Sequence, residues 1–205
     1  MRLPPATVPN NRYSTGVPPP LVSDGELLDR LTEVFRRHGY DGASLSVIAA
    51  ATGLQRSSLY HRFPGGKEQM ASEVARALGD HFGSQVLAPL DGDEPVEDRL
   101  AAVAQALLRF YDAGKAGCLL DVLTLGSPGP ATTDALAEAA RAWIAAFAAA
   151  AGQASFGPAE ARRRAEDAIA AIEGGLVLAR VTGDHKPFRR AVQRLGPMLT
   201  GNEGA

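Results

Sequence analysis

The side chains that could bind a partner gather in residues 54–67, which carry three cationic side chains and no acid. Arginine can bind O6 and N7 of guanine with two hydrogen bonds, and hydroxyl groups suit phosphate oxygens. This composition favours contact with DNA, although a small solvated helix inside any helical bundle would present similar residues. The hydrogen-bond donors before Phe63 are Arg56, Ser57, Ser58, Tyr60, His61 and Arg62.

Two short helices are expected to present these donors. Ser44 is a good N-cap for the first helix, because its hydroxyl can accept a hydrogen bond from a free backbone N–H of the first turn. Gly53 follows that helix where a C-terminus favours a left-handed residue. The second helix spans 55–61, has Leu59 as an inward anchor and is stopped by Pro64. Two helices joined by a glycine-containing turn form a helix-turn-helix, whose second helix lies in the major groove of DNA.

Residues 26–82 resemble the N-terminal domain of TetR-family transcriptional regulators. The pattern Leu-Tyr-x-x-Phe after Ile-Ala-x-x-x-Gly is specific, and the two glycines before Lys67 resemble the LmrA-like branch of the family, as does the run Gly117-Cys118-Leu119-Leu120. The matching motifs are Gly39-Tyr40, Ser44-Leu45, Ile48-Ala49, Gly53-Leu54, Leu59-Tyr60-His61-Arg62-Phe63 and Lys67-Glu68.

This resemblance implies a homodimer that binds double-stranded operator DNA. Lys67 lies near the start of a longer helix that joins the two parts of the chain, so we expect it to reach a phosphate. The alternative for Lys67 is a solvated charge. The DNA-binding residues that follow from the motif are Ser44, Gln55, Arg56, Ser57, Ser58, Tyr60, His61, Arg62 and Lys67.

The composition predicts an all-α chain. Hydrophobic residues make up 45% of the 205 residues and are largely Ala and Leu, which favour helices, while strand-like runs of Val, Ile and Thr are missing. The net charge of −2 means that nucleic-acid binding must come from a local patch. A single cysteine excludes an internal disulfide and a cysteine-based zinc site. The sequence starts without an apolar signal core and has no uninterrupted apolar stretch of transmembrane length, so the cytoplasm is the expected compartment.

Three parts are expected along the chain. The first is rich in Pro and small polar residues and should lack a fold of its own; the alternative is an arm that touches DNA through Arg2 or Arg12. A loop rich in Pro, Gly and acids marks the boundary between the other two. The predicted parts are a flexible tail (1–22), a helix-turn-helix domain (23–88) with a linking helix that starts near residue 67, and a helical effector-binding and dimerisation domain (95–200).

The last of these parts is expected to bind a small molecule. The resemblance implies an effector, often apolar or aromatic, and pockets are usually apolar with a few placed polar groups. The alternative is a plain core, which is what an aromatic stripe at helical spacing more often forms. The candidate effector-binding residues are Leu107, Phe110, Tyr111, Asp121, Trp143, Phe147, Glu173, Leu176 and Arg180.

Two amphipathic helices near the C-terminus carry more apolar surface than one protomer easily covers. The resemblance implies that they form a four-helix interface with their copies in a second chain. The alternative is that both helices are buried inside the protomer. The candidate interface residues are Ala165, Ile169, Ile172, Leu176, Val192 and Leu195.

No group of residues indicates an enzyme. Cys118 lies in an apolar run, which is typical of an inert buried thiol. The histidines at positions 38, 61, 81 and 185 lack metal-ligand spacing, so neither a metal nor another cofactor is expected.

The hypothesis is therefore a ligand-responsive DNA-binding regulator, specifically a repressor that an effector releases from a palindromic operator. One alternative is a helical small-molecule-binding protein without operator recognition. A second alternative is an enzyme of unknown chemistry on a helical fold.

Overall fold

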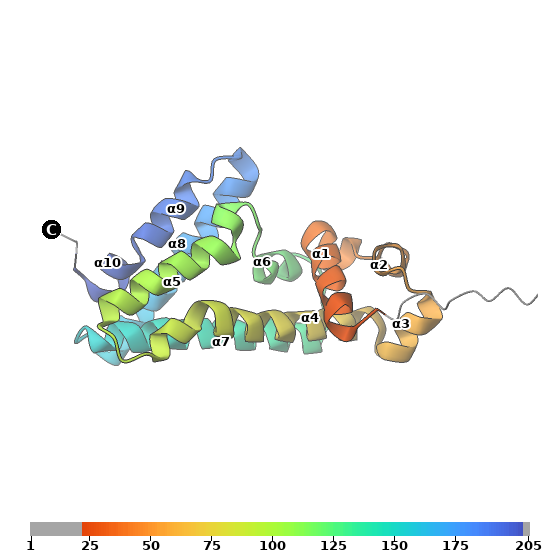
Figure 1. Ribbon diagram of the computed structural model, residues 1–205, viewed down its shortest axis with the longest axis horizontal. Helices are drawn as coiled ribbons and strands as arrows, with labels where there is room; N and C mark the ends of the chain where they lie inside the picture. The colour runs from red at the N-terminus through yellow and green to blue at the C-terminus, as the bar shows by residue number, and fades with distance from the viewer. Residues whose placement is uncertain (1–21, 203–205) are drawn as a thin grey trace, which may run out of the picture.

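The structure is a computed structural model that describes residues 22–202, and all regular structure in this range is helical (Figure 1). The all-α prediction is therefore confirmed. Residues 1–21 of the predicted tail, including Arg2 and Arg12, lie outside the described part of the chain.

The first part of the described chain forms four helices whose ends follow from local chemistry. Ser23 and Ser44 cap the first two helices by accepting hydrogen bonds from the N–H of Glu26 at 3.2 Å and of Val47 at 3.3 Å. The first helix kinks at Gly39, where φ is 64°, and continues to Gly42. The helices are α1 (Asp24–Gly42), α2 (Leu45–Thr52), α3 (Arg56–Arg62) and α4 (Gly66–Phe82).

The remaining chain adds six helices and three short turns. A π turn, η1 (Gly83–Leu87), directly prolongs α4. Proline stands in the first turn of α7, α8 and α9, where its missing N–H leaves no hydrogen bond unmade. The other elements are η2 (Ala88–Asp91), α5 (Val96–Phe110), η3 (Asp112–Gly114), α6 (Leu119–Thr124), α7 (Pro130–Gln153), α8 (Pro158–Thr182), α9 (Lys186–Gln193) and α10 (Leu195–Thr200).

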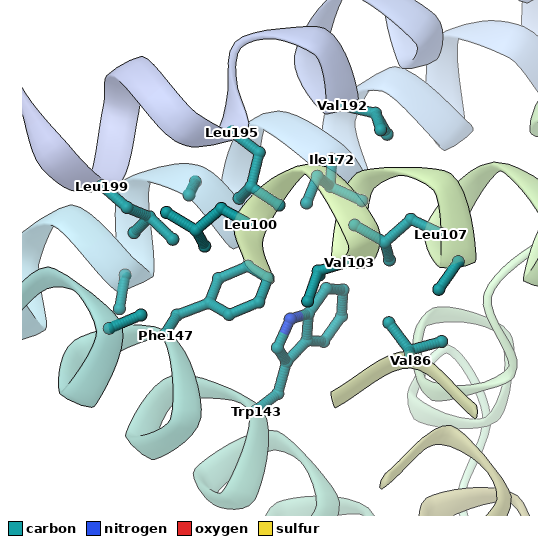
Figure 2. Packing of buried hydrophobic residues seen from close by; sticks show 14 of the residues in the cluster. Val86, Leu100, Val103, Leu107, Trp143, Phe147, Ile172, Val192, Leu195 and Leu199 are labelled. Atoms are coloured by element: carbon teal, nitrogen blue, oxygen red, sulfur yellow. The ribbon is translucent and has the colours of Figure 1, made fainter. Parts of the chain in front are cut away.

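Helices α4 and α7 run side by side along the molecule, with α1, α2 and α3 at one end and α5, α8, α9 and α10 at the other (Figure 1). At the second end, Trp143 and Phe147 of α7 pack against Leu100 and Val103 of α5, and Leu195 closes the same core from α10 (Figure 2). By length and composition α7 could cross a membrane. In this structure it is a core helix, because it packs against α4 and α8.

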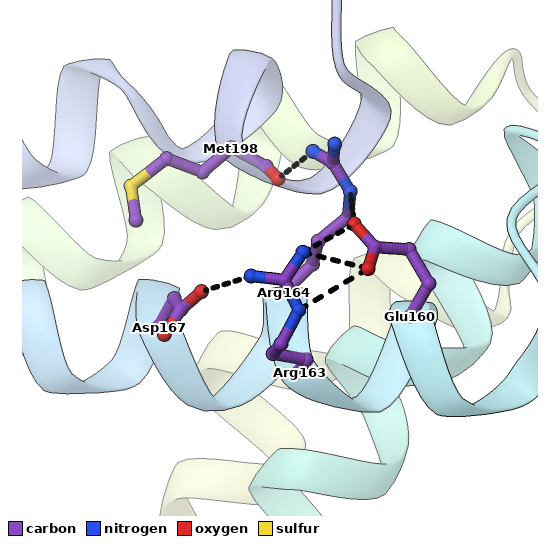
Figure 3. Close-up of polar contacts among 5 residues, drawn as sticks. All are labelled: Glu160, Arg163, Arg164, Asp167 and Met198. Carbon is purple, nitrogen blue, oxygen red and sulfur yellow. Dashed lines mark hydrogen bonds and ion pairs between the residues drawn. The ribbon is translucent and has the colours of Figure 1, made fainter.

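Arg164 joins the start of α8 to α10 (Figure 3). It donates to the carboxylate of Glu160 at 2.8 Å and to the carbonyl oxygen of Met198 at 2.9 Å. Arg163 pairs with the same carboxylate at 2.6 Å, within α8. The ion pairs orient Arg164, and its hydrogen bond to Met198 connects the two helices.

The helices at the first end do not close a core by themselves. Leu119 and Leu123 of α6, together with Ala135 and Leu136 of α7, are buried in the same cluster as the inward residues of α1, α2, α3 and α4. Segments that follow residue 95 therefore complete the packing of the helix-turn-helix. A movement of α6 or α7 must change the support of these first helices.

Glu68, in the first turn of α4, makes the polar connection between the same segments. Its carboxylate accepts hydrogen bonds from the N–H of Gly129 at 2.8 Å and the N–H of Thr132 at 2.9 Å, which are free N–H groups at the start of α7. It also accepts a hydrogen bond from the hydroxyl of Tyr40 in α1 at 3.0 Å. The hydroxyl of Thr133 donates to the carbonyl of Gly129, so the cap of α7 comes from Glu68 on a distant helix.

The electrostatics of this contact favour the carboxylate. Burial raises the pKa of Glu68, but the hydrogen bonds from Thr132, Gly129 and Tyr40 outweigh it, and the net pKa lies below the ordinary value. Burial and the neighbouring Glu68 raise the pKa of Tyr40 to about 12, so Tyr40 stays a donor at neutral pH.

We predict that Glu68→Gln lowers the free energy of unfolding by on the order of 1–2 kcal/mol at pH 7, the typical cost of a lost helix cap. Because the folded-state pKa of Glu68 is lowered, its contribution is present above the ordinary pKa of Glu and is lost as pH falls through the lower folded value. Urea unfolding of both proteins between pH 7 and pH 3 should show the difference shrinking in acid. Glu73→Gln, whose carboxylate accepts from Gln69 on the same helix, is the control and should show no such trend.

Candidate nucleic-acid interface and ligand cavity

The turn between α2 and α3 is fixed from both sides. Gly53 ends α2 at φ 71°, and its N–H donates to the carbonyl of Ala49 at 3.0 Å. The fully buried Thr52 donates its hydroxyl to the carbonyl of Ile48 at 2.8 Å, and Arg30 of α1 donates to the carbonyl of Thr52 at 2.7 Å. The angle between the two helices is therefore held by α1 as well as by the turn itself.

Helix α3 presents the expected donors to solvent. Leu59 is fully buried and anchors the helix, while Arg56 donates to the hydroxyl of Ser46 and so links α3 to α2. No acidic residue lies in α3. This face can offer hydrogen bonds to base edges and phosphates without repelling a polyanion. The exposed predicted residues are Gln55, Arg56, Ser57, Ser58, Tyr60 and His61.

Two predicted DNA-binding cations, Arg62 and Lys67, make contacts inside the protein. Arg62 donates to the carbonyl of Val22 at 2.8 Å and pairs with Asp24 at 3.3 Å, so it fastens α3 to the start of α1. Lys67 donates to the carbonyl of Tyr40 at 2.9 Å, and its ammonium lies 4.3 Å from the centre of that ring. Ser44, also predicted, is exposed and serves as the cap of α2. The geometry thus gives Arg62 and Lys67 positioning roles.

A cavity of about 290 Å³ lies between α1, α4, α6 and α7 and reaches the end of α5. Its wall is mainly apolar, with Phe82 and Trp143 in ring contact at 4.7 Å and Phe82 and Phe110 at 5.2 Å. Among the predicted effector residues, Phe110, Tyr111 and Trp143 line it. The charged residues of the wall are Arg36, Arg76, Asp80 and Glu138.

The other six predicted effector residues do not line this cavity. Leu107, Phe147 and Leu176 are buried among core side chains, because helical spacing identifies an inward face without telling core from pocket. Asp121 and Arg180 pair with each other at 2.9 Å. Glu173 also stands outside the wall, and burial raises its pKa above the ordinary range. These six residues therefore lie outside the wall of this cavity.

The buried thiol matches the expectation of an inert cysteine. Cys118 lines the cavity, and burial, with the nearby Glu173, raises its pKa to about 12. A thiol in this state carries almost no thiolate at neutral pH. The hydroxyl of Tyr111 donates to its sulfur at 3.6 Å.

Most of the predicted interface residues are also corrected. Ala165, Ile172, Leu176, Val192 and Leu195 are buried inside a single chain, so they are unavailable to a second one; Ile169 is half-buried. The inward alternative holds for these five positions.

The apolar side chains of α8 that face solvent lie on a different side of the helix from its buried residues. Leu178 is 50% exposed and Val181 is 74% exposed, and Val177 is exposed beside them. The sequence does not predict this strip, because the richer apolar stripe of the helix faces inward. No local pattern connects Arg36 of α1 or Phe82 of α4 to a pocket either.

Two family models match the sequence. Residues 27–74 match the model described as bacterial regulatory proteins, tetR family, and residues 95–194 match that of the C-terminal domain of LmrA/YxaF-like transcriptional regulators. The HTH-type transcriptional regulator LmrA of Bacillus subtilis is 25% identical over 173 residues, covering 80% of this chain and 89% of the relative. The HTH-type transcriptional repressor AcnR of Corynebacterium efficiens is 37% identical over 57 residues, covering 28% of this chain and 30% of the relative.

Solved structures share the fold. A TetR transcriptional regulator from Legionella pneumophila matches with a TM-score of 0.75 at 19% identity, over 86% of this chain and 97% of that one. The TetR-family regulator CifR, in a structure with 26-bp double-strand operator DNA, matches with a TM-score of 0.70 at 23% identity, over 87% and 97%.

We predict that Lys67→Met lowers the free energy of unfolding by about 1 kcal/mol in the absence of DNA, because it removes a hydrogen bond and a cation–π contact to Tyr40. Lys186→Met, at an exposed lysine on α9, is the matched control and should leave unfolding unchanged. If Lys67→Met and the wild type have the same free energy of unfolding in urea, the contacts to Tyr40 do not stabilise the fold. Lys67 is then a solvated charge that is free to face a phosphate.

Proposed function

The chain belongs to the tetR family of bacterial regulatory proteins, in the branch of LmrA-like transcriptional regulators, and we propose that it is a homodimeric repressor that a small molecule releases from a palindromic operator. DNA-binding regulation is the function of the family, and its members bind operator DNA as dimers. The observation that carries the proposal is the exposed, acid-free face of α3 on a turn that α1 holds rigid. We assign residues 23–88 to DNA binding and residues 95–200 to effector binding and dimerisation, and we place the protein in the cytoplasm.

On operator DNA, Arg56 is the side chain best suited to read a base. It is exposed on the first turn of α3, and its guanidinium can leave the Ser46 hydroxyl for two acceptors on guanine. Ser57, Ser58 and Tyr60 suit phosphate oxygens. Two α3 helices related by a two-fold axis would contact half-sites about one helical turn apart, ~34–36 Å, or a multiple of it.

The exposed strip of α8 suits a second copy of the chain. Val177 and Leu178 are neighbours that lie one turn before Val181 on the exposed side of the helix. An apolar strip of this kind is costly to leave in water in a monomer. Pairing α8 with its copy across a two-fold axis would cover both strips at once.

The position of the cavity supports release by an effector. Its wall joins α1 and α4, which hold the helix-turn-helix, to α6 and α7, which complete the core beneath it. A molecule that binds better to one arrangement of these helices shifts the spacing of the two α3 helices away from the operator. The coupling is reciprocal, so operator DNA weakens binding of the same molecule by the same factor.

The first alternative is a small-molecule-binding protein without operator recognition. Selection from a random DNA library, followed by footprinting, separates the two. An inverted repeat protected on two half-sites supports the repressor; a failure to enrich any sequence favours the alternative.

We predict that Arg56→Ala lowers discrimination between the selected operator and random DNA by on the order of 1–3 kcal/mol, because one bidentate base contact is lost. Arg37→Ala, at an exposed arginine on α1, is the control. Fluorescence anisotropy at several salt concentrations measures both affinities. Equal weakening on operator and random DNA would show that Arg56 contacts phosphate rather than bases.

We predict that Val181→Glu gives a folded monomer that loses operator binding, because the side chain is 74% exposed in one chain and would be buried without a partner in the dimer. Leu125→Glu, at a residue 73% exposed just after α6, is the matched control and should remain a dimer. Sedimentation velocity and circular dichroism measure assembly and folding. A dimeric Val181→Glu protein would place the interface elsewhere.

A further inference from the structure

We propose that the effector is a compact apolar acid whose anionic group binds Arg36, so that the ligand is held directly by α1 of the DNA-binding part. This inference rests on the proposed function and adds the chemical class of the ligand and the residue that selects it.

Arg36, in the wall of the cavity, has a buried donor without a partner among residues 22–202. Its guanidinium donates through one terminal nitrogen to Glu33 at 2.6 Å, while Nε is buried and makes no hydrogen bond within the described part of the chain. The Arg36 side chain is 28% exposed, so the protein covers most of it. A buried N–H of this kind needs an acceptor, and a charged donor gains most from an anionic one.

The other charged wall residues do not offset this donor inside the cavity. Arg76, Asp80 and Glu138 are all exposed, so water screens them. Glu33, the acid that pairs with Arg36, is 57% exposed, so water screens its charge as well. The enclosed part of the wall therefore offers positive charge.

Trp143 carries a second buried donor that has no partner in the part of the chain that the structure describes, its indole N–H, but this N–H faces the core. The indole nitrogen lies on the side of the ring that faces Phe147 (Figure 2). Tyr111 already donates its hydroxyl to Cys118. Arg36 is therefore the side chain in the described wall that can bind an incoming charge, and the surrounding aromatic rings bind an apolar body.

The volume limits the size of that body. A cavity of about 290 Å³ lies at the lower end of the ~300–1,000 Å³ that is usual for small-molecule sites, which suits one or two rings or a short chain.

Arg36 is connected through α1 to the turn between α2 and α3. Arg36 and Arg30 lie on the same helix, and Arg30 holds the carbonyl of Thr52 at the end of α2. An anion that draws the Arg36 guanidinium away from Glu33 and toward the cavity shifts α1 relative to α4 and α7. The same shift moves the support of α3.

The test uses matched acids and amides of similar shape: benzoate and benzamide, 4-phenylbutyrate and its amide, and 2-naphthoate and 2-naphthamide. Isothermal titration calorimetry measures binding to the full-length protein. We expect at least one acid to bind wild type about ten- to a hundredfold more tightly than its amide, the range for a charge-assisted hydrogen bond. Arg36→Gln should abolish that preference, and Arg37→Gln should keep it.

Two further variants guard against a folding artefact. Arg36→Lys keeps the charge but lacks Nε, and should retain part of the preference. Glu33→Gln removes the competing carboxylate and should tighten acid binding several-fold, which a damaged protein would not do. The inference is overturned if none of the acids binds, if amides bind as well as acids, or if the preference survives in Arg36→Gln.

Operator release is measured separately by anisotropy with the same compounds. If acids bind through Arg36 but leave operator affinity unchanged, the ligand class stands and ligand-controlled repression fails. If amides bind and release the operator while acids do neither, regulation stands and the role of Arg36 is wrong.

Discussion

The carboxylate of Glu68 is the contact on which the arrangement of the two halves depends. It accepts hydrogen bonds from α1 through Tyr40 and from the first turn of α7 through Gly129 and Thr132, while it belongs to α4. Three helices from distant parts of the chain thus share one charged group. A Cβ on Gly129 would lie 2.7 Å from the Glu68 side chain, so this close approach also explains the glycine. Any shift of α7 must either carry α4 with it or break these bonds.

The hydrophobic packing reinforces the same connection. Leu119, Leu123 and Leu136 are buried in the core of the helix-turn-helix although they follow the predicted domain boundary. The cavity lies between this shared core and the core around Trp143 and Phe147. A ligand in this cavity would lie between two packed cores. Because close-packed interiors do not deform gradually, the expected response to it is a discrete shift of the helices.

The distribution of cations follows from two competing demands. Arg30, Arg62 and Lys67 each donate to a backbone carbonyl near a helix end, so they fix the angles between α1, α2, α3 and α4. Arg56 and the hydroxyl groups of α3 remain on the exposed face. With a net charge of −2, the chain cannot rely on a general attraction to DNA, and the orientation of this small group must supply specificity.

Local sequence determined the caps at Ser23, Ser44 and Gly53, the helix-turn-helix and the family, because caps, turns and short motifs depend on residues a few positions apart. It also determined the exposed donors of α3, since Leu59 fixes which face is buried. Only the tertiary structure decided which apolar stripe is core and which is free: Ile172 and Leu195 pack inside one chain, whereas Val181 does not. Helical periodicity defines a face but not what covers it. The same limit applies to Arg36 and Glu68, whose roles depend on residues far away in sequence that only the packed fold brings within reach.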